Sequence, residues 1–186
     1  APNHKHFFDS YLVNFSNTLE AQEILFEITE KYSITRLVNN VGVVIPSAIE
    51  ETSITDFNHI FQTNALSALI STKAVLPQMK LKRFGRIVSI SSRVVLGKEL
   101  RTAYSASKAS LLAMTRTWAL ELSEYGVTVN CVGPGPIGTT AFWKNNPKTS
   151  QATQSIISGI PLKRMGTIDD VAHAVSFFMN GQSSLI

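Results

Sequence analysis

The chain has 186 residues, of which 44% are hydrophobic and 16% are charged, and it carries a formal net charge of +4. This composition is typical of a globular domain, and no apolar run approaches the about 18 residues of a membrane span. The basic residues are too dispersed to predict a nucleic-acid-binding face. We therefore expect a protein that binds neither nucleic acid nor membrane. The single cysteine, Cys131, excludes an internal disulfide, which is typical of a cytoplasmic protein.

Strand-like and helix-like segments alternate from the N-terminus. Residues 7–15 are rich in aromatic and aliphatic side chains and predict a strand. Residues 19–32 place apolar side chains at helical spacing and predict a helix. A second strand is predicted at 35–38, and it ends in a polar turn that contains a glycine, Asn39-Asn40-Val41-Gly42.

The same alternation continues through the middle of the chain. The predicted elements are a helix over 53–79 with Pro77 near its end, a strand over 85–92, a loop over 93–102, a helix over 104–125 closed by Gly126, and a strand over 127–132. The strands are almost continuously apolar, which is typical of a parallel sheet covered on both faces. The sequence therefore predicts a doubly wound, Rossmann-like α/β fold, and with no linker or repeat we expect one domain over 1–186.

Residues 140–158 differ from their surroundings because they are polar apart from aromatic side chains near the start, Phe142 and Trp143. We interpret this segment as a mobile lid over a binding site. Thr167 to Asp170 resembles a capping box, which predicts that a last helix begins there.

Tyr104 and Lys108 are four residues apart in the helix over 104–125, so they share one helical face. A tyrosine that exchanges protons near neutral pH needs its pKa lowered by roughly 3, which is about 4 kcal/mol. Only a partly buried ammonium, at about 4 Å, supplies that much. The pair therefore predicts acid–base chemistry inside a cleft.

Several polar motifs fall at the carboxyl ends of predicted strands, where doubly wound sheets place their sites. They are Asn39-Asn40-Val41-Gly42, Ser91-Ser92 and Pro134-Gly135-Pro136-Ile137-Gly138-Thr139, and Tyr104-Ser105-Ala106-Ser107-Lys108 opens the next helix after the serines. In this order the motifs resemble those of the short-chain dehydrogenase/reductase family, and the resemblance covers nearly the whole chain.

The resemblance implies a catalytic group made of Asn64, a serine, Tyr104 and Lys108. Tyr104 would exchange the proton of a carbonyl or alcohol oxygen, Lys108 would lower the pKa of Tyr104, and Asn64 would hold a water in a proton relay. The family usually places its serine thirteen residues before the tyrosine, which selects Ser91 because 104 − 91 = 13. Aligning the end of the strand selects Ser92 instead, and we prefer Ser92 because loops absorb deletions.

The resemblance also implies NAD or NADP as the cofactor and no metal. Besides Tyr104 and Lys108, its binding residues would be Asn14, Asn39, Asn40, Val41, Gly42, Pro134, Gly135, Ile137 and Thr139. Val41 replaces the alanine that is usual in the family, and we expect this change to be tolerated. The choice between NAD and NADP depends on a strand that these residues do not contain, and Asn14 gives no help.

No counterpart of the family's glycine-rich phosphate turn occurs in these 186 residues, and they stop about where the family's last strand would begin. We therefore expect the sheet to be incomplete at both ends, the natural protein to be longer, and this stretch alone to be inactive. The resemblance is closest to reductases of the 3-oxoacyl-carrier-protein type. It implies a small-molecule carbonyl or alcohol substrate and a homodimer or homotetramer formed through the two long helices, and the alternative is a non-catalytic dinucleotide sensor.

Overall fold

The computed structural model describes residues 9–186, and its centre is a parallel sheet with the strand order β1-β2-β3. The strands are β1 (Arg36–Asn39), β2 (Gly85–Ile90) and β3 (Val127–Val132). Val88 in β2 pairs with Val38 on one side and with Asn130 on the other. β2 is buried along nearly its whole length, as expected for a central strand that is covered on both faces.

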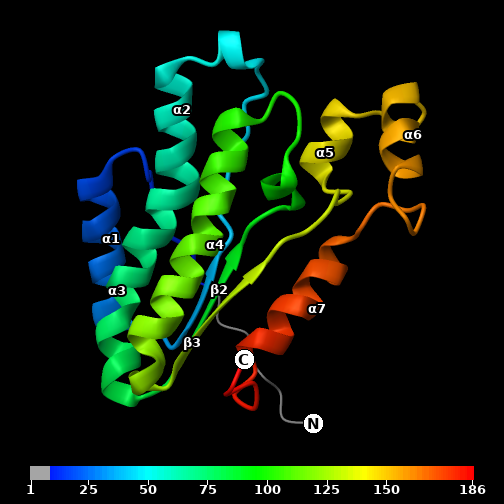
Figure 1. The fold of residues 1–186 in the computed structure, drawn as a ribbon. Coiled ribbons are helices and arrows are strands. Elements are labelled where there is room, and N and C mark those ends of the chain that lie inside the picture. Colours follow the sequence, from blue (N-terminus) through cyan, green and yellow to red (C-terminus); the bar gives the residue numbers. More distant parts are fainter. Residues whose placement is uncertain (1–8) are drawn as a thin grey trace.

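Helices cover both faces of the sheet (Figure 1). α1 (Thr18–Lys31), α3 (Ser67–Lys82) and α4 (Thr102–Leu122) lie on one side, and α7 (Ile168–Met179) lies on the other. The other helices are α2 (Ile54–Phe61), which leads into α3, and two short helices that follow β3, α5 (Thr140–Asn145) and α6 (Gln151–Ser158). The predicted α/β fold with a parallel sheet between helices is confirmed.

The core lies between the sheet and the pair α3 and α4. Its buried members are apolar side chains from all of these elements: Val75, Met79, Ile87, Leu122, Val127 and Val129. Gly85 allows the close packing at the start of β2, because a Cβ there would lie 2.7 Å from the Met79 sulfur. This packing fixes α4, and with it Tyr104 and Lys108, against the sheet.

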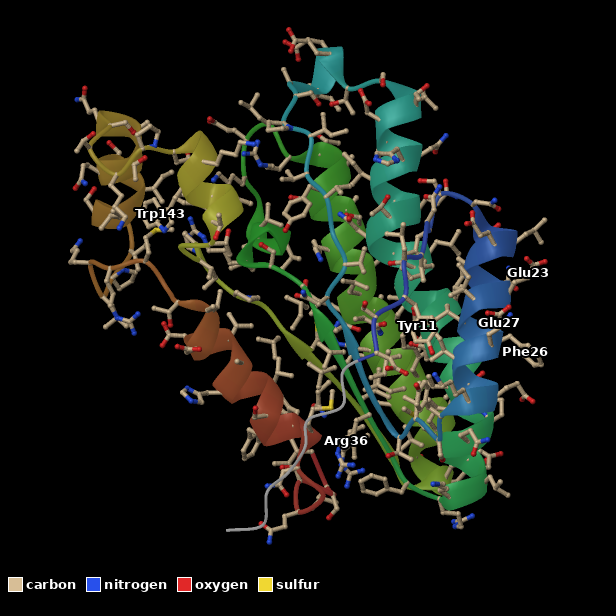
Figure 2. All side chains as sticks on the ribbon, turned by 180° about the vertical axis from the view of Figure 1, so that it is seen from behind. Tyr11, Glu23, Phe26, Glu27, Arg36 and Trp143 are labelled. Carbon is tan, nitrogen blue, oxygen red and sulfur yellow. The ribbon has the colours of Figure 1, made fainter. Side chains whose placement is uncertain are left out.

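The strand predicted for residues 7–15 is wrong over the part that the structure describes, since 9–15 form neither strand nor helix. Strand propensity yields a strand only where a neighbouring strand offers hydrogen bonds, and the three-stranded sheet does not include this segment. The segment instead runs beside α1 (Figure 2), where the Lys31 ammonium lies 3.0 Å from the Asp9 carboxylate and 3.4 Å from the Tyr11 hydroxyl.

The helix predicted over 53–79 is present, but it differs in two ways. A π-helical turn, Gln62–Leu66, separates α2 from α3. Pro77 does not end the helix, which continues to Lys82. Proline removes the hydrogen bond to the carbonyl of Lys73 four residues earlier, and because both residues are exposed, water can bind that carbonyl.

Candidate active site

Tyr104 and Lys108 lie in the first two turns of α4, which begins directly after Arg101. Tyr104 is half-buried, and Lys108 is only 3% exposed. The Lys108 ammonium lies 6.0 Å from the centre of the Tyr104 ring, on the side of α4 that faces the carboxyl end of β2. The expected sharing of one helical face is therefore confirmed.

The Lys108 ammonium is bound to the sheet by a single hydrogen bond, 2.7 Å long, to the carbonyl of Ile90. Burial lowers the pKa of Lys108 from 10.5 to about 8, and the Cys131 thiol acts in the opposite direction. Lys108 therefore remains mainly protonated at pH 7. An ammonium has three donors, and the strand uses one of them.

Burial also dominates the behaviour of Tyr104, and it raises the pKa of the phenol. A hydrogen bond from the Ser92 side chain and the positive charge of Arg101 act to lower this pKa but do not overcome the burial. The lowering expected from Lys108 is thus not the net result in this structure. Tyr104 is a neutral phenol at pH 7, which is the form that donates a proton.

The two candidate serines have different surroundings. The Ser91 hydroxyl is buried and donates to the carbonyl of Lys108 at 2.7 Å. The Ser92 hydroxyl is partly exposed, accepts a hydrogen bond from the Val94 N–H at 3.2 Å and reaches the Tyr104 phenol. Ser91 therefore joins β2 to α4, whereas Ser92 is the serine beside Tyr104.

Asn64 is 1% exposed and lies within the π-helical turn. Its side-chain oxygen accepts from the Val43 N–H at 2.7 Å, and its amide donates to the Val43 carbonyl at 2.9 Å and to the Ser107 hydroxyl at 3.0 Å. Asn64 thus ties the loop after β1 to α4. Both amide N–H groups of Asn64 are therefore engaged, whereas its side-chain oxygen accepts one of the two hydrogen bonds that it can accept. Ser107 was not predicted from the sequence, although it lies within the Tyr104–Lys108 motif.

The turn after β1 contains one buried residue that is held by hydrogen bonds, followed by exposed residues. The Asn39 amide is buried and donates to Thr72 at 3.3 Å and to Ser89 at 3.4 Å, while Asn40 and Val41 are exposed. A Cβ on Gly42 would lie 3.0 Å from the Lys108 ammonium. The absence of a side chain therefore leaves room directly beside the ammonium, which fits residues that hold a polyhydroxylated cofactor such as NAD(P).

The loop after β3 lies at the same end of the sheet. The Pro134 carbonyl accepts from the Arg93 N–H at 2.9 Å, which joins this loop to the segment that follows Ser92. The Thr139 hydroxyl caps α5 by accepting from the Phe142 N–H at 3.1 Å. Ile137 is bridged to Gly166, and Gly135 is exposed.

Asn14 is not joined to the other candidate cofactor residues. It is exposed, and its side-chain oxygen accepts from the Ser16 N–H at 3.0 Å in the turn before α1. No hydrogen bond within residues 9–186 connects it to the group around Lys108.

The predicted lid forms two short helices, α5 and α6, rather than an irregular loop. Trp143 on α5 (Figure 2) packs edge-on against Phe142, and a Cβ on Gly138 would lie 2.9 Å from its indole. A hollow of about 500 Å³ lies between α5 and the start of α7, and it contacts neither Tyr104 nor Lys108. It is lined by Gly138, Thr139, Thr140, Ala141, Trp143, Met165, Gly166, Thr167 and Ile168.

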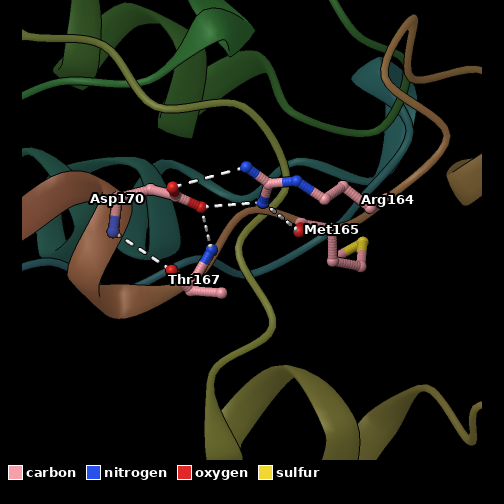
Figure 3. Close-up of polar contacts among 4 residues, drawn as sticks. All are labelled: Arg164, Met165, Thr167 and Asp170. Carbon is pink, nitrogen blue, oxygen red and sulfur yellow. Dashed lines mark hydrogen bonds and ion pairs between the residues drawn. The ribbon is translucent and has the colours of Figure 1, made fainter.

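The far wall of this hollow is held by the predicted capping box, which is confirmed (Figure 3). The Asp170 N–H donates to the Thr167 hydroxyl at 3.1 Å, and the Thr167 N–H donates to the Asp170 carboxylate at 2.8 Å. The Arg164 guanidinium lies 2.9 Å from the same carboxylate and also donates to the Met165 carbonyl. Because of these bonds the pKa of Asp170 lies far below its usual range.

The described residues contain neither a cluster of metal ligands nor a membrane-spanning helix. Over residues 9–186 no three His, Cys, Asp or Glu side chains gather as a metal site would require. No helix in that range is long and apolar enough to span a membrane.

Comparison with known proteins gives consistent matches. A family model described as enoyl-(acyl carrier protein) reductase matches residues 5–186. A 3-oxoacyl-[acyl-carrier-protein] reductase from Thermotoga maritima is 33% identical over 180 residues, which are 96% of this chain and 72% of the relative. A (2S)-[(R)-hydroxy(phenyl)methyl]succinyl-CoA dehydrogenase subunit from Thauera aromatica is 37% identical over 150 residues, which are 81% of this chain and 59% of the relative.

Solved structures agree with these relatives. ElxO with NADP bound is 31% identical and superposes with a TM-score of 0.88, covering 95% of this chain and 72% of that protein. NAD⁺-bound xylitol dehydrogenase is 26% identical with a TM-score of 0.87, covering 95% of this chain and 74% of that protein. These relatives and structures give no support to the alternative of a non-catalytic sensor.

Proposed function

Because the chain belongs to the short-chain dehydrogenase/reductase family of NAD(P)-dependent oxidoreductases, we propose that it interconverts a carbonyl and a secondary alcohol with Tyr104 as the acid–base group. The observation that carries this proposal is the contact between Ser92 and a half-buried, neutral Tyr104 beside the buried ammonium of Lys108. This is the set of groups that a carbonyl oxygen needs when it gains a proton.

When NAD(P)H is bound it supplies the hydride that reduces the carbonyl carbon, and NAD(P)⁺ is the product. Tyr104 donates the proton to the carbonyl oxygen, and the Ser92 hydroxyl donates a hydrogen bond to that same oxygen. Reduction therefore consumes one hydride and one proton, and alcohol oxidation returns both.

The cofactor would be held by the residues around Lys108. The Lys108 ammonium has donors that Ile90 does not use, and Gly42 leaves space beside it for ribose hydroxyls. The cofactor would also contact residues of the loops after β1 and β3: Asn40, Val41, Pro134, Gly135, Ile137 and Thr139. Asn39 would hold the turn after β1 in place, and Asn14 would lie near the adenine. Asn64 would position the loop after β1 and offer its backbone carbonyl to a relay water.

Assembly and location belong to the same proposal: one domain over 1–186, in a homodimer or homotetramer in the cytoplasm. The two long helices that would join the subunits carry apolar side chains, and of these Ala65, Ile70 and Leu111 are buried within the chain. Partly exposed side chains on the same helices are Leu66, Leu69 and Met114, whereas Trp118 packs against the core. Sedimentation of the purified protein would measure the subunit number.

The function is tested with the purified full-length protein, NADH or NADPH and a panel of ketones, by following nicotinamide absorbance. Tyr104→Phe is expected to lower kcat at least about 100-fold, because it removes the proton donor without changing the ring. Tyr125→Phe is the matched control, since this tyrosine lies beyond the other end of α4. A Tyr104→Phe enzyme with more than about a tenth of normal activity would defeat the mechanism.

A further inference from the structure

Three cationic side chains, Arg93, Lys98 and Arg101, stand on the loop between Ser92 and α4, and we call them the basic rim. The side chain of Arg93 passes over the loop after β3, with its Cδ 3.8 Å from where a Cβ on Gly135 would stand. Arg101 precedes α4 directly, and its charge acts on the Tyr104 phenol. The basic rim therefore extends from the proposed cofactor loop to the proton donor.

The loop that carries the basic rim is anchored at both ends. The Ser105 hydroxyl donates to the Val94 carbonyl at 3.0 Å, and the Ser47 N–H donates to the Leu100 carbonyl at 3.2 Å. Leu100 has a φ of +59°, a conformation that a leucine adopts only where its surroundings impose it. The backbone of the loop is thus fixed, while the side chains of Arg93 and Lys98 are exposed and that of Arg101 is partly exposed.

The charges of the basic rim are not neutralised within residues 9–186. The two salt bridges of that range are Lys31–Asp9 and Arg164–Asp170, so neither involves the rim. The Arg101 guanidinium donates to the carbonyl of the adjacent Leu100 at 2.8 Å. Burial lowers the pKa of Lys98, and the charges of Arg101 and Arg93 lower it further.

Few acidic residues lie near the basic rim. Glu99 on the same loop and Glu50 and Glu51 in the turn after Ala48 are exposed, and none of them forms a salt bridge in the described part of the chain. The segment from Val132 to Ile168, whose Pro134 carbonyl accepts from the Arg93 N–H, contains no aspartate or glutamate. The first turn of α4 has no acidic residue and no side-chain cap, so its helix dipole adds positive potential.

We propose that the basic rim binds an anionic group, a carboxylate or a phosphate, on the substrate whose carbonyl oxygen meets Tyr104. Two guanidinium groups and an ammonium are the side chains that recognise such groups. Since Arg101 lies three residues before Tyr104 and its charge acts on the phenol, we place the anion on a small molecule, within a few bonds of the reacting carbon. The substrate class is therefore an oxo acid or a phosphorylated ketone, and this inference rests on the proposed function.

The test compares charged ketones with neutral twins, using the full-length protein and its preferred cofactor. The pairs are acetoacetate with methyl acetoacetate for a carboxylate, and dihydroxyacetone phosphate with dihydroxyacetone for a phosphate. At least one anionic member is expected to have a kcat/KM at least about tenfold above its twin. Added salt should lower kcat/KM for the anion and leave the neutral twin unchanged.

The variant Arg93→Gln/Arg101→Gln is expected to remove this preference by raising KM for the anion, while KM for the neutral twin stays the same. Arg116→Gln, on an exposed part of α4, is the matched control and should keep the preference. A wild-type enzyme that reduces neutral ketones without preference overturns this inference and leaves the proposed function intact. Reduction of no ketone by any form overturns both.

Two further results would also overturn the proposal. One is an equal loss of activity toward charged and neutral ketones in the double variant, which would make the basic rim structural. The other is a preference that appears only with a ketone linked to acyl carrier protein, which would mean that the rim contacts a macromolecule.

Discussion

The buried cations at the two ends of the sheet differ in the number of their hydrogen-bond partners. At the amino end, Arg86 is 2% exposed and its guanidinium donates to the carbonyls of Gly85, Gly126, Asn180 and Gly181. Its neighbour Arg36 (Figure 2) donates to Met179 at 2.9 Å, and both guanidinium groups lie over the Phe84 ring. At the carboxyl end, Lys108 is as deeply buried but has one carbonyl partner.

The difference separates stability from function. The carbonyls after α7 carry the negative end of its helix dipole, so they satisfy Arg86 and fasten the helix to the sheet. The ammonium at the opposite end keeps unused donors at an energetic cost, as expected where a ligand completes the site. Arg86, with four carbonyl partners, is therefore structural, and the single partner of Lys108 supports the proposal that Lys108 belongs to the active site.

Lys108→Met gives the largest expected effect and tests the carboxyl end. Activity should fall at least about 1,000-fold, or about 4 kcal/mol, because the cofactor and proton donor lose their charged neighbour. The free energy of unfolding at pH 7 should rise by up to about 3 kcal/mol, because a buried charge is removed. Denaturant titration with and without the substitution measures this, and Lys73→Met on the exposed side of α3 is the control.

The pH dependence gives a further check on that substitution. Since Lys108 has a pKa of about 8 when folded and near 10.5 when unfolded, the unfolded chain binds more protons between these values. Wild-type stability should therefore gain on Lys108→Met as pH rises from 8 to 10.5. A constant difference over this range would show that Lys108 is not buried as a cation.

Arg86→Leu tests the amino end and should act in the opposite way. It takes the guanidinium away from the Gly181 carbonyl and leaves the Asn180 carbonyl with the Ser183 N–H alone. We expect a loss of about 3 kcal/mol of stability with kcat/KM unchanged below the melting range. Arg36→Leu is the matched control on the same Phe84 ring, and since Arg36 is exposed its loss should stay below about 1 kcal/mol. An equal effect of both changes would contradict the structural role of Arg86.

Ser92→Ala and Ser91→Ala compare two adjacent hydroxyls at the carboxyl end. Ser92→Ala should lower kcat about 100-fold through loss of the hydrogen bond to the substrate oxygen. Ser91→Ala should mainly lower stability, by about 1 kcal/mol, because it removes the link from β2 to the Lys108 carbonyl. Steady-state kinetics and melting curves separate the two, and a reversal of the pattern would make Ser91 the catalytic serine.

Gly126→Ala should affect stability alone. Gly126 has a φ of +69°, and a Cβ there would collide with the Arg83 carbonyl at the amino end of the sheet. We expect a loss of about 1 to 2 kcal/mol of stability and normal kcat/KM. A loss of activity in the folded variant would show that the two ends of the sheet are coupled.

The sequence predicted the elements whose signals are local. The helix that carries Tyr104 and Lys108, the strands over 85–90 and 127–132, and the Thr167 capping box were all visible as periodicity or spacing. The sequence also predicted that Lys108, Gly42 and Ser92 lie at the same end of the sheet, because parallel strands share a carboxyl edge.

What the sequence did not predict depends on contacts between distant residues. The absence of a strand over 9–15 depends on which strands are beside it, and the persistence of the helix past Pro77 depends on the exposure of Lys73. The upward shift in the pKa of Tyr104 depends on its burial, and the spacing of Tyr104 and Lys108 alone pointed the other way. The basic rim depends on the position of the Arg93 side chain beside Gly135, which is distant in the sequence.

The π-helical turn at Gln62–Leu66 sets the rotation of one helix relative to another. Its wider hydrogen bond, from the Ser67 N–H to the Gln62 carbonyl, turns every later side chain by about one residue, or about 100°. Asn64 can therefore point to Ser107 on α4 while Thr72 and Met79 point to the sheet. Removing one residue here would restore a regular helix, and the chain could then keep either the core or the loop beside Lys108 in place, but not both.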